Sequence, residues 1–152
     1  MIKSNLYRIA TVLCFLLLTA ATVFVIIRWP QMPDQIPMHY NFAGEVNSYG
    51  SKWMMLLLMG LAWVALIVLS ISVKYPEKWN MPVKVTAENK SRLFAITRAM
   101  VEVIKVLTTM LFVLLFISAP LGTSIPQWAM IILFSGVMLT VIVGMALIYK
   151  NK

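Results

Sequence analysis

Charged residues are scarce in this chain of 152 residues. They make up 12% of the sequence, whereas a soluble globular domain usually carries about 25%. Hydrophobic residues account for 61%. The polar side chains are too few to cover a soluble globule of this length, so the composition excludes that class and indicates a membrane protein.

The sequence also has only one cysteine, Cys14, and one histidine, His39. A lone cysteine cannot form an intrachain disulfide, and one cysteine with one histidine cannot supply the ligands of a zinc site. We therefore expect no metal and no cofactor. Cys14 is interpreted as a small apolar packing residue.

The motifs of common catalytic sites are missing as well. The chain has no HExxH, no P-loop and no GxGxxG, and no spacing singles out a pair among its five acidic residues. His39 has no serine placed to act with it as a nucleophile. We expect that the protein is not an enzyme, and a membrane enzyme acting on lipid or peptide is the third hypothesis.

Long apolar runs are what the chain has in abundance. Four of them occupy residues 9–27, 53–73, 99–119 and 128–149, and about 20 helical residues cross the ~30 Å hydrocarbon layer of a bilayer. The sequence thus predicts one all-α membrane domain, residues 1–152, with four transmembrane helices. The first run is longer than a signal-peptide core and no clear cleavage site follows, so we expect a retained anchor.

Basic residues are distributed unevenly between the connections. Of the 13 lysines and arginines, ten lie in the N-terminal tail, the 74–98 loop and the C-terminus, whereas the opposite side has only Arg28 and Lys52. Positive residues favour the cytoplasm, so we expect both termini and the 74–98 loop inside and the 28–52 loop outside. The net charge of +8 then faces anionic lipid head groups rather than nucleic acid.

The 28–52 loop has the composition of an ordered segment. Pro33 and Pro37 restrict the backbone, and Gly44 and Gly50 permit turns. Its apolar residues alternate along the chain: Ile36, Met38, Tyr40 and Phe42. This alternation predicts a short extended segment with one buried face, lying as a cap on the mouth of the bundle.

His39 in this loop has two interpretations. Histidine changes charge near neutral pH, so His39 is a candidate for a proton-sensitive or ligand-contacting group on the outer face. The alternative is a structural histidine that is hydrogen-bonded to the backbone and holds the cap. Asn41, close by, is expected to support a turn.

The third apolar run carries a polar stripe. Arg98, Glu102, Lys105 and Thr109 fall on one helix face, and Glu102 is spaced to pair with either basic neighbour. Lys105 is expected to snorkel toward the interface. Ionisable groups in a membrane are often functional, so a small transporter or channel subunit is the second hypothesis; a neutralised seam between helices is the alternative.

Two further features concern the helices themselves. Thr86 is a plausible N-cap, with a helix from Ala87 that runs unbroken into the third span. Gly136, Thr140 and Gly144 form a face of small residues in the fourth, which favours packing within the molecule, although an oligomer stays open.

Two segments resemble a known family. The first, residues 32–52, contains Ile36-Pro37-Met38-His39, Gly44 and Gly50-Ser51-Lys52. The second, residues 80–89, is followed by Arg92 and Arg98. Together they resemble a bacterial membrane domain of unknown function that forms the N-terminal half of the SdpI-like immunity proteins. Asn47 and Tyr49 stand where that family often has Asp and Trp, and SdpI-type proteins carry additional C-terminal helices.

The resemblance implies a multi-pass protein of the bacterial cytoplasmic (inner) membrane. It implies immunity to, or sensing of, a membrane-active peptide or amphipathic ligand through the outer loop, with a peptide toxin as partner outside and a soluble regulator docking on the cytoplasmic segment. The loop residues concerned are Pro33, Ile36, Pro37, His39, Tyr40, Asn41, Gly44, Gly50 and Lys52. The cytoplasmic residues are Pro82, Thr86, Asn89 and Arg92.

Overall fold

The structure, a computed structural model, describes residues 2–41, 43 and 45–152. Its main elements are four helices, α1 (Ile2–Arg28), α2 (Met54–Ser72), α3 (Lys90–Leu121) and α4 (Gln127–Lys150), with short 3-10 turns η1 (Trp29–Gln31) and η2 (Pro76–Lys78). All four helices are long and apolar enough to cross a membrane. The four helices expected from the apolar runs are confirmed.

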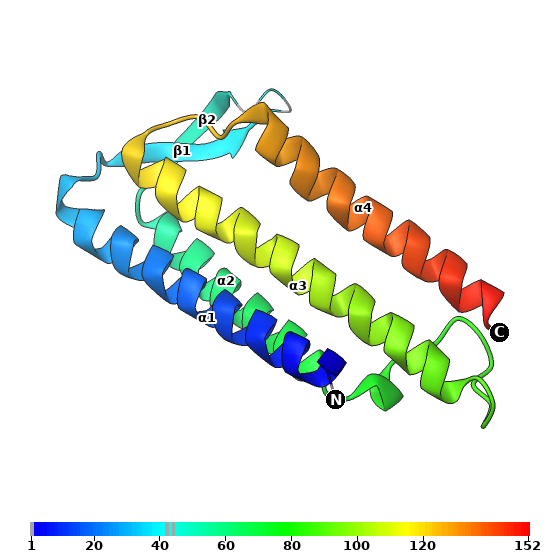
Figure 1. The fold of residues 1–152 in the computed structure, drawn as a ribbon. Helices are drawn as coiled ribbons and strands as arrows, with labels where there is room; N and C mark the ends of the chain where they lie inside the picture. Colours follow the sequence, from blue (N-terminus) through cyan, green and yellow to red (C-terminus); the bar gives the residue numbers. More distant parts are fainter. Residues whose placement is uncertain (1, 42, 44) are drawn as a thin grey trace.

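The expectation of a purely α-helical protein is incomplete, because the loop after η1 folds into an antiparallel hairpin. Strand β1 (Gln35–Tyr40) pairs with β2 (Val46–Ser51), and the hairpin lies across one end of the helices (Figure 1). Ile36 is fully buried and Tyr40 is buried, as the alternation predicts; Phe42 lies outside the described residues. Strand β2 escaped prediction because its side chains are mostly exposed and polar, without an alternating apolar pattern.

Helix α3 is the centre of the bundle, with α1 and α2 packed on one side and α4 on the other (Figure 1). The core between α1, α2, α3 and the hairpin is apolar and includes Leu18, Val25, Ile36, Met55 and Phe116. Large apolar side chains are exposed on the outside of all four helices, which suits contact with lipid chains.

Helix α4 packs on α3 through its small residues. Gly144 is buried against the Met100 side chain, and Gly136 faces Leu107. A Cβ atom at Gly144 would collide with the Met100 thioether. The small-residue face of α4 therefore serves packing within the molecule, as the sequence favoured.

The two ends of the bundle differ. The hairpin and the turn between α3 and α4 share one end, and both chain termini lie at the other (Figure 1). Tyr40 packs with Ile125 and Ala129 at the hairpin end, and its hydroxyl donates to the Thr123 carbonyl at 3.5 Å. This contact joins the hairpin to the start of α4.

The start of α3 differs from the prediction. The regular helix begins at Lys90, not Ala87, and a turn precedes it. Thr86 N–H donates to Asn89 Oδ1 at 2.8 Å, and Asn89 N–H donates to Thr86 Oγ1 at 3.3 Å. This reciprocal pattern is that of a capping box. Thr86 therefore makes capping hydrogen bonds, although the residue directly before the helix is Asn89.

Helix α3 then runs unbroken to Leu121, as predicted. It ends at Gly122, which has a φ of 64°. Thr123 N–H donates to the Ser118 carbonyl and Gly122 N–H to the Ala119 carbonyl, the arrangement of a Schellman motif.

Candidate functional site

The outer face of the hairpin presents polar side chains. His39 on β1 donates from Nδ1 to the amide oxygen of Asn47 on β2, at 2.6 Å. Both residues are exposed. The hydrogen bond of His39 is thus to a side chain, whereas the structural interpretation expected the backbone, and it fixes the imidazole on the open surface.

Two different sets of polar interactions close the two ends of the hairpin. At the tip, Asn41 Oδ1 accepts hydrogen bonds from the Ala43 and Glu45 amides at 2.9 and 3.0 Å, the turn expected for asparagine. At the base, the Lys52 ammonium lies 3.0 Å from the Asp34 carboxylate, and Lys52 N–H donates to the Asp34 carbonyl at 2.9 Å. Asn41 and Lys52 therefore shape the hairpin.

The other residues of the loop motif differ in their burial. Pro37 is buried and Pro33 is exposed. A Cβ atom at Gly50 would lie 2.7 Å from Met38 Cγ, so a larger residue would displace Met38. Gly44 lies outside the described residues.

Burial raises the pKa of the Tyr40 phenol above its ordinary 10.0, and Tyr49 raises this pKa further.

The polar stripe of α3 turns inward and meets α1. The Lys105 ammonium lies 2.7 Å from Glu102 Oε1 and donates to Thr11 Oγ1 of α1 at 2.6 Å. The Lys105 side chain is 0% exposed and the Glu102 side chain 6%. The expectation that Lys105 snorkels is wrong, because Glu102 and Thr11 satisfy its ammonium inside the bundle.

The remaining members of the stripe have separate partners. Arg98 donates from Nε to the Val73 carbonyl at 3.1 Å, so Glu102 pairs with Lys105 and not with Arg98. Thr109 is buried and donates to the Lys105 carbonyl. Thr11 was missed, because a single threonine in a long apolar run carries no pattern that links it to another helix.

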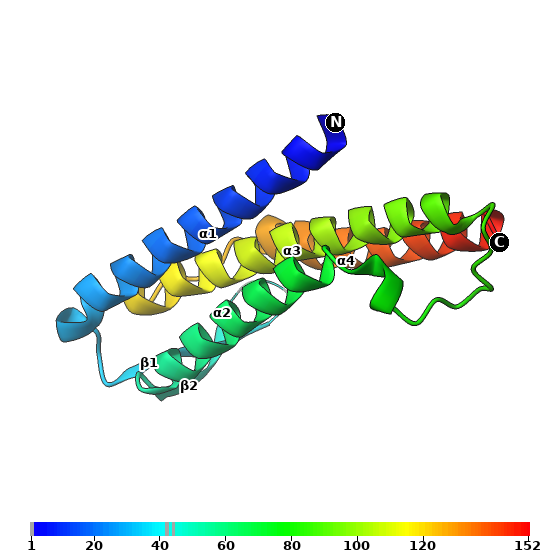
Figure 2. The ribbon, with the colours of Figure 1, turned by 90° about the horizontal axis from the view of Figure 1, so that it is seen from below.

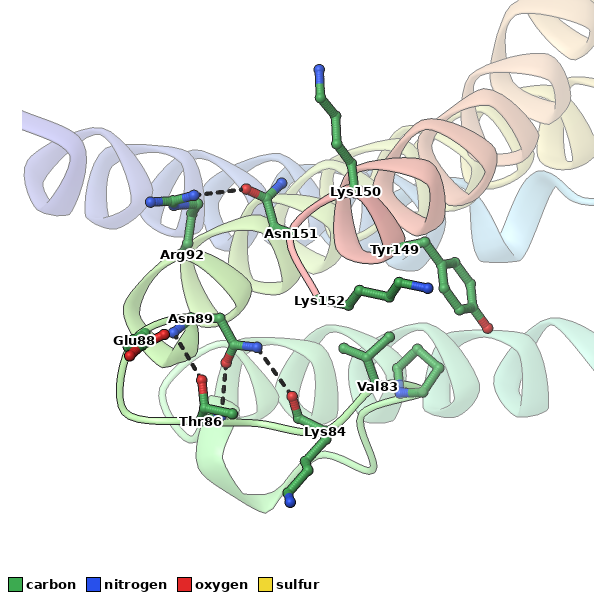
Figure 3. Close-up of a pocket in the computed structure, with 11 residues that line it drawn as sticks. Val83, Lys84, Thr86, Glu88, Asn89, Arg92, Tyr149, Lys150, Asn151 and Lys152 are labelled. Carbon is green, nitrogen blue, oxygen red and sulfur yellow. Dashed lines mark hydrogen bonds between the residues drawn. The ribbon is translucent and has the colours of Figure 1, made fainter.

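The motif expected on the cytoplasmic side forms one wall of a basic cavity. Its four residues, Pro82, Thr86, Asn89 and Arg92, all line a cavity of about 750 Å³ that the C-terminal residues 149–152 complete. Arg92 donates to Asn151 Oδ1 at 3.2 Å across this cavity (Figure 3). Asn89 Nδ2 donates to the Lys84 carbonyl at 3.1 Å (Figure 3), which holds the preceding segment in place.

The charge of this cavity is predominantly positive. One acidic side chain, Glu88, lines it. The basic side chains that line it are Lys84, Arg92, Lys150 and Lys152. The sequence indicated the motif but not the cavity, because the C-terminal residues that close it are distant along the chain.

These features define a class: a predominantly helical protein with four helices long and apolar enough to span a membrane and a β-hairpin at one end. Residues 16–64 match the family described as "Domain of unknown function (DUF1648)", a membrane-associated domain. The matched segment is less than half of the chain and runs from α1 through the hairpin into α2. Comparison with curated proteins and with solved structures gives no match.

Proposed function

We propose that the protein is a small multi-pass protein of the bacterial cytoplasmic membrane that confers immunity to, or senses, a membrane-active peptide, as the SdpI-like proteins do. In this proposal the hairpin faces outward and both termini face the cytoplasm. The charge distribution supports the orientation, since ten of the 13 basic residues belong to the end opposite the hairpin.

The observation that carries the proposal is the two-faced hairpin. Ile36 and Tyr40 anchor one face in the bundle, while His39 and Asn47 are exposed and joined to each other on the outer surface. The hairpin is also central to the matched segment 16–64. An ordered polar surface on a rigid anchor suits recognition, because little conformational entropy is lost on binding.

The chemistry of the hairpin end suits a cationic amphipathic peptide. Glu45 is an exposed carboxylate there, Asp34 is a second one that pairs with Lys52, and Tyr49 and Trp53 are exposed aromatic side chains. Aromatic rings offer large contact areas, and carboxylates attract positive charge. The opposite end, with its many lysines and arginines, would repel such a peptide.

The basic cavity offers a place for a cytoplasmic partner. Lys84 and Arg92 line it on one side and Lys152 on the other, so an acidic segment of a soluble regulator is the complementary surface. Binding outside and docking inside would together account for a sensing protein.

The polar stripe supports transport less well. The Lys105 ammonium is enclosed by Glu102 and Thr11, which favours a neutralised seam between α1 and α3 over a conducting path. Catalysis has similarly weak support, because the partner of His39 is the amide of Asn47 and not a second titratable group.

The test is peptide challenge of a sensitive bacterial strain. Cells with and without the wild-type protein are exposed to a panel of cationic amphipathic pore-forming peptides, and membrane depolarisation and growth are measured. We expect the wild-type protein to raise the inhibitory concentration of at least one peptide, and His39→Ala with Asn47→Ala to abolish this effect. Gln35→Ala, also exposed on β1, is the control and should keep it. Equal sensitivity with and without the wild-type protein across the panel contradicts the proposal.

A further inference from the structure

A cleft opens between α1, α2 and α3 at the end that carries the termini. It has a volume of about 660 Å³ and is lined from three helices and their ends, with Tyr7, Arg8, Ser70, Lys74 and Arg98 among the lining residues. Helix α1 diverges from α3 toward its N-terminal end (Figure 2). The cleft therefore combines three positive side chains with hydroxyl groups.

The positive charges in this cleft are not neutralised by the protein. Among the described residues, no carboxylate lies within 4.0 Å of Arg8, Lys74 or Arg98, since the two ion pairs found involve Lys52 and Lys105. Arg98 is held in place by its hydrogen bond to the Val73 carbonyl. Three cations that line one cleft without a carboxylate of the described residues within 4.0 Å make the local potential positive.

A second observation at the same cleft points to a ligand. The hydroxyl of Ser70, which lines the cleft, is buried and has no hydrogen-bond partner among the residues that the structure describes. Buried polar groups are nearly always hydrogen-bonded, so a ligand that reaches this hydroxyl would complete its hydrogen bonding. A phosphate oxygen would accept from Ser70 while the cations neutralise its charge.

The depth of the cleft identifies the kind of phosphate. Arg8, Lys74 and Arg98 each border an apolar run, which is the level of lipid head groups. Lys105 is seven residues beyond Arg98 on α3, about 10 Å deeper. Val12 is one turn inward from Arg8, lines the cleft and is 56% exposed, so it is placed to contact an acyl chain.

We propose that this cleft binds the phosphate group of an anionic phospholipid, with Arg8, Lys74 and Arg98 as the cationic ligands and Ser70 as a hydrogen-bond donor. Basic pockets between transmembrane helices are suited to such head groups. The cleft is separate from the hairpin. A failure of lipid binding would therefore not contradict peptide immunity, and a failure of peptide immunity would not contradict lipid binding.

The test is native mass spectrometry of the full-length protein in detergent, titrated with phosphatidylglycerol or phosphatidylcholine. We expect the wild-type protein to bind phosphatidylglycerol preferentially. Arg8→Gln with Lys74→Gln should weaken this binding by about 30-fold. The control, Lys78→Gln with Lys90→Gln, removes the same charge at residues that do not line the cleft and should change binding less than about threefold.

A second variant separates binding from folding. Ser70→Ala removes a hydroxyl that has no partner in the described part of the chain, so the melting temperature of this variant in lipid-free detergent should match the wild type while its affinity for phosphatidylglycerol falls several-fold. An unchanged affinity in Ser70→Ala, or an equal loss in both double variants, would overturn the proposal. Displacement of the lipid by excess inorganic phosphate would reassign the cleft to a soluble anion and overturn it too.

Discussion

At the scale of single residues, the burial of the Lys105–Glu102 ion pair is energetically costly. Both side chains are removed from solvent, and among the described residues the Glu102 oxygens have no partner other than Lys105. Desolvation of two charges costs several kcal/mol, and their attraction offsets this only when both remain present. The pair is thus more sensitive to loss of one member than of both.

Lys105→Met should therefore destabilise the protein by about 3 kcal/mol or more, because Glu102 would be left buried without a counter-charge. The double variant Lys105→Met with Glu102→Gln should recover most of this loss. Thermal unfolding in detergent measures both. A double variant that is less stable than Lys105→Met alone would contradict the account.

Tyr40 gives a prediction for alkaline pH. Burial raises its pKa in the folded protein above the ordinary 10.0, so the folded state holds the proton more tightly than the unfolded state. The stability that the protonated Tyr40 contributes is fully present below about pH 10 and is lost as the pH rises through the higher, folded-state pKa. Tyr40→Phe cannot ionise at this position, so its melting temperature should fall less between about pH 9 and 12. Tyr149→Phe, at an exposed position, is the control and should follow the wild type; identical profiles for all three proteins would exclude a role of Tyr40.

At the scale of elements, α4 depends on its contact with α3. Gly144 approaches the Met100 side chain so closely that a Cβ atom has no room unless Met100 moves. Gly60 on α2 provides the contrast, since a Cβ atom there meets nothing within 4 Å.

Gly144→Leu should force α4 away from α3 and destabilise the bundle by about 1–3 kcal/mol, the usual cost of overpacking. Gly60→Leu should leave stability within about 0.5 kcal/mol of the wild type. Resistance to unfolding in increasing SDS compares the two variants. Equal resistance would show that the close approach at Gly144 is not needed.

The helices could be predicted from the sequence because each follows from a long apolar run, and strand β1 because Ile36, Met38 and Tyr40 alternate. Strand β2 and the beginning of α3 could not. Most residues of β2 are exposed, so no apolar pattern marks the strand. Thr86 carries the hydrogen bonds of a cap, but the regular helix begins at Lys90, since one turn intervenes.

The same limit applies to the sites. Asn41 and the polar stripe of α3 were identified from the sequence, because local spacing is enough to place them. The partners Thr11, Asn47 and Asn151 were not. Each comes from a different element, and only the packing of the chain brings it to its contact.

At the scale of the whole molecule, the two ends carry different charge. Arg28 and Lys52 are the basic residues of the hairpin end, and ten others belong to the opposite end. Trp29 and Trp53 stack edge to face at the hairpin end, with ring centroids 5.3 Å apart. Tryptophan is enriched at membrane interfaces, so this pair marks a plausible boundary.

The proposed orientation can be tested by cysteine labelling. In a Cys14→Ala background, Ser48→Cys on the hairpin should react with a membrane-impermeant maleimide on intact cells, because Ser48 is exposed. Lys84→Cys, exposed at the other end, should react only after the cells are opened. The reverse pattern would invert the orientation and remove the basis for peptide recognition by the hairpin.

The contact between Tyr40 and the turn before α4 has a structural consequence. It connects the hairpin to the beginning of α4, a helix of 24 residues that is about 36 Å long. From this contact α4 packs along α3 through Gly136 and Gly144. At the far tip the Arg92–Asn151 hydrogen bond joins the end of α4 to the start of α3, so one continuous helix connects the hairpin with the basic cavity.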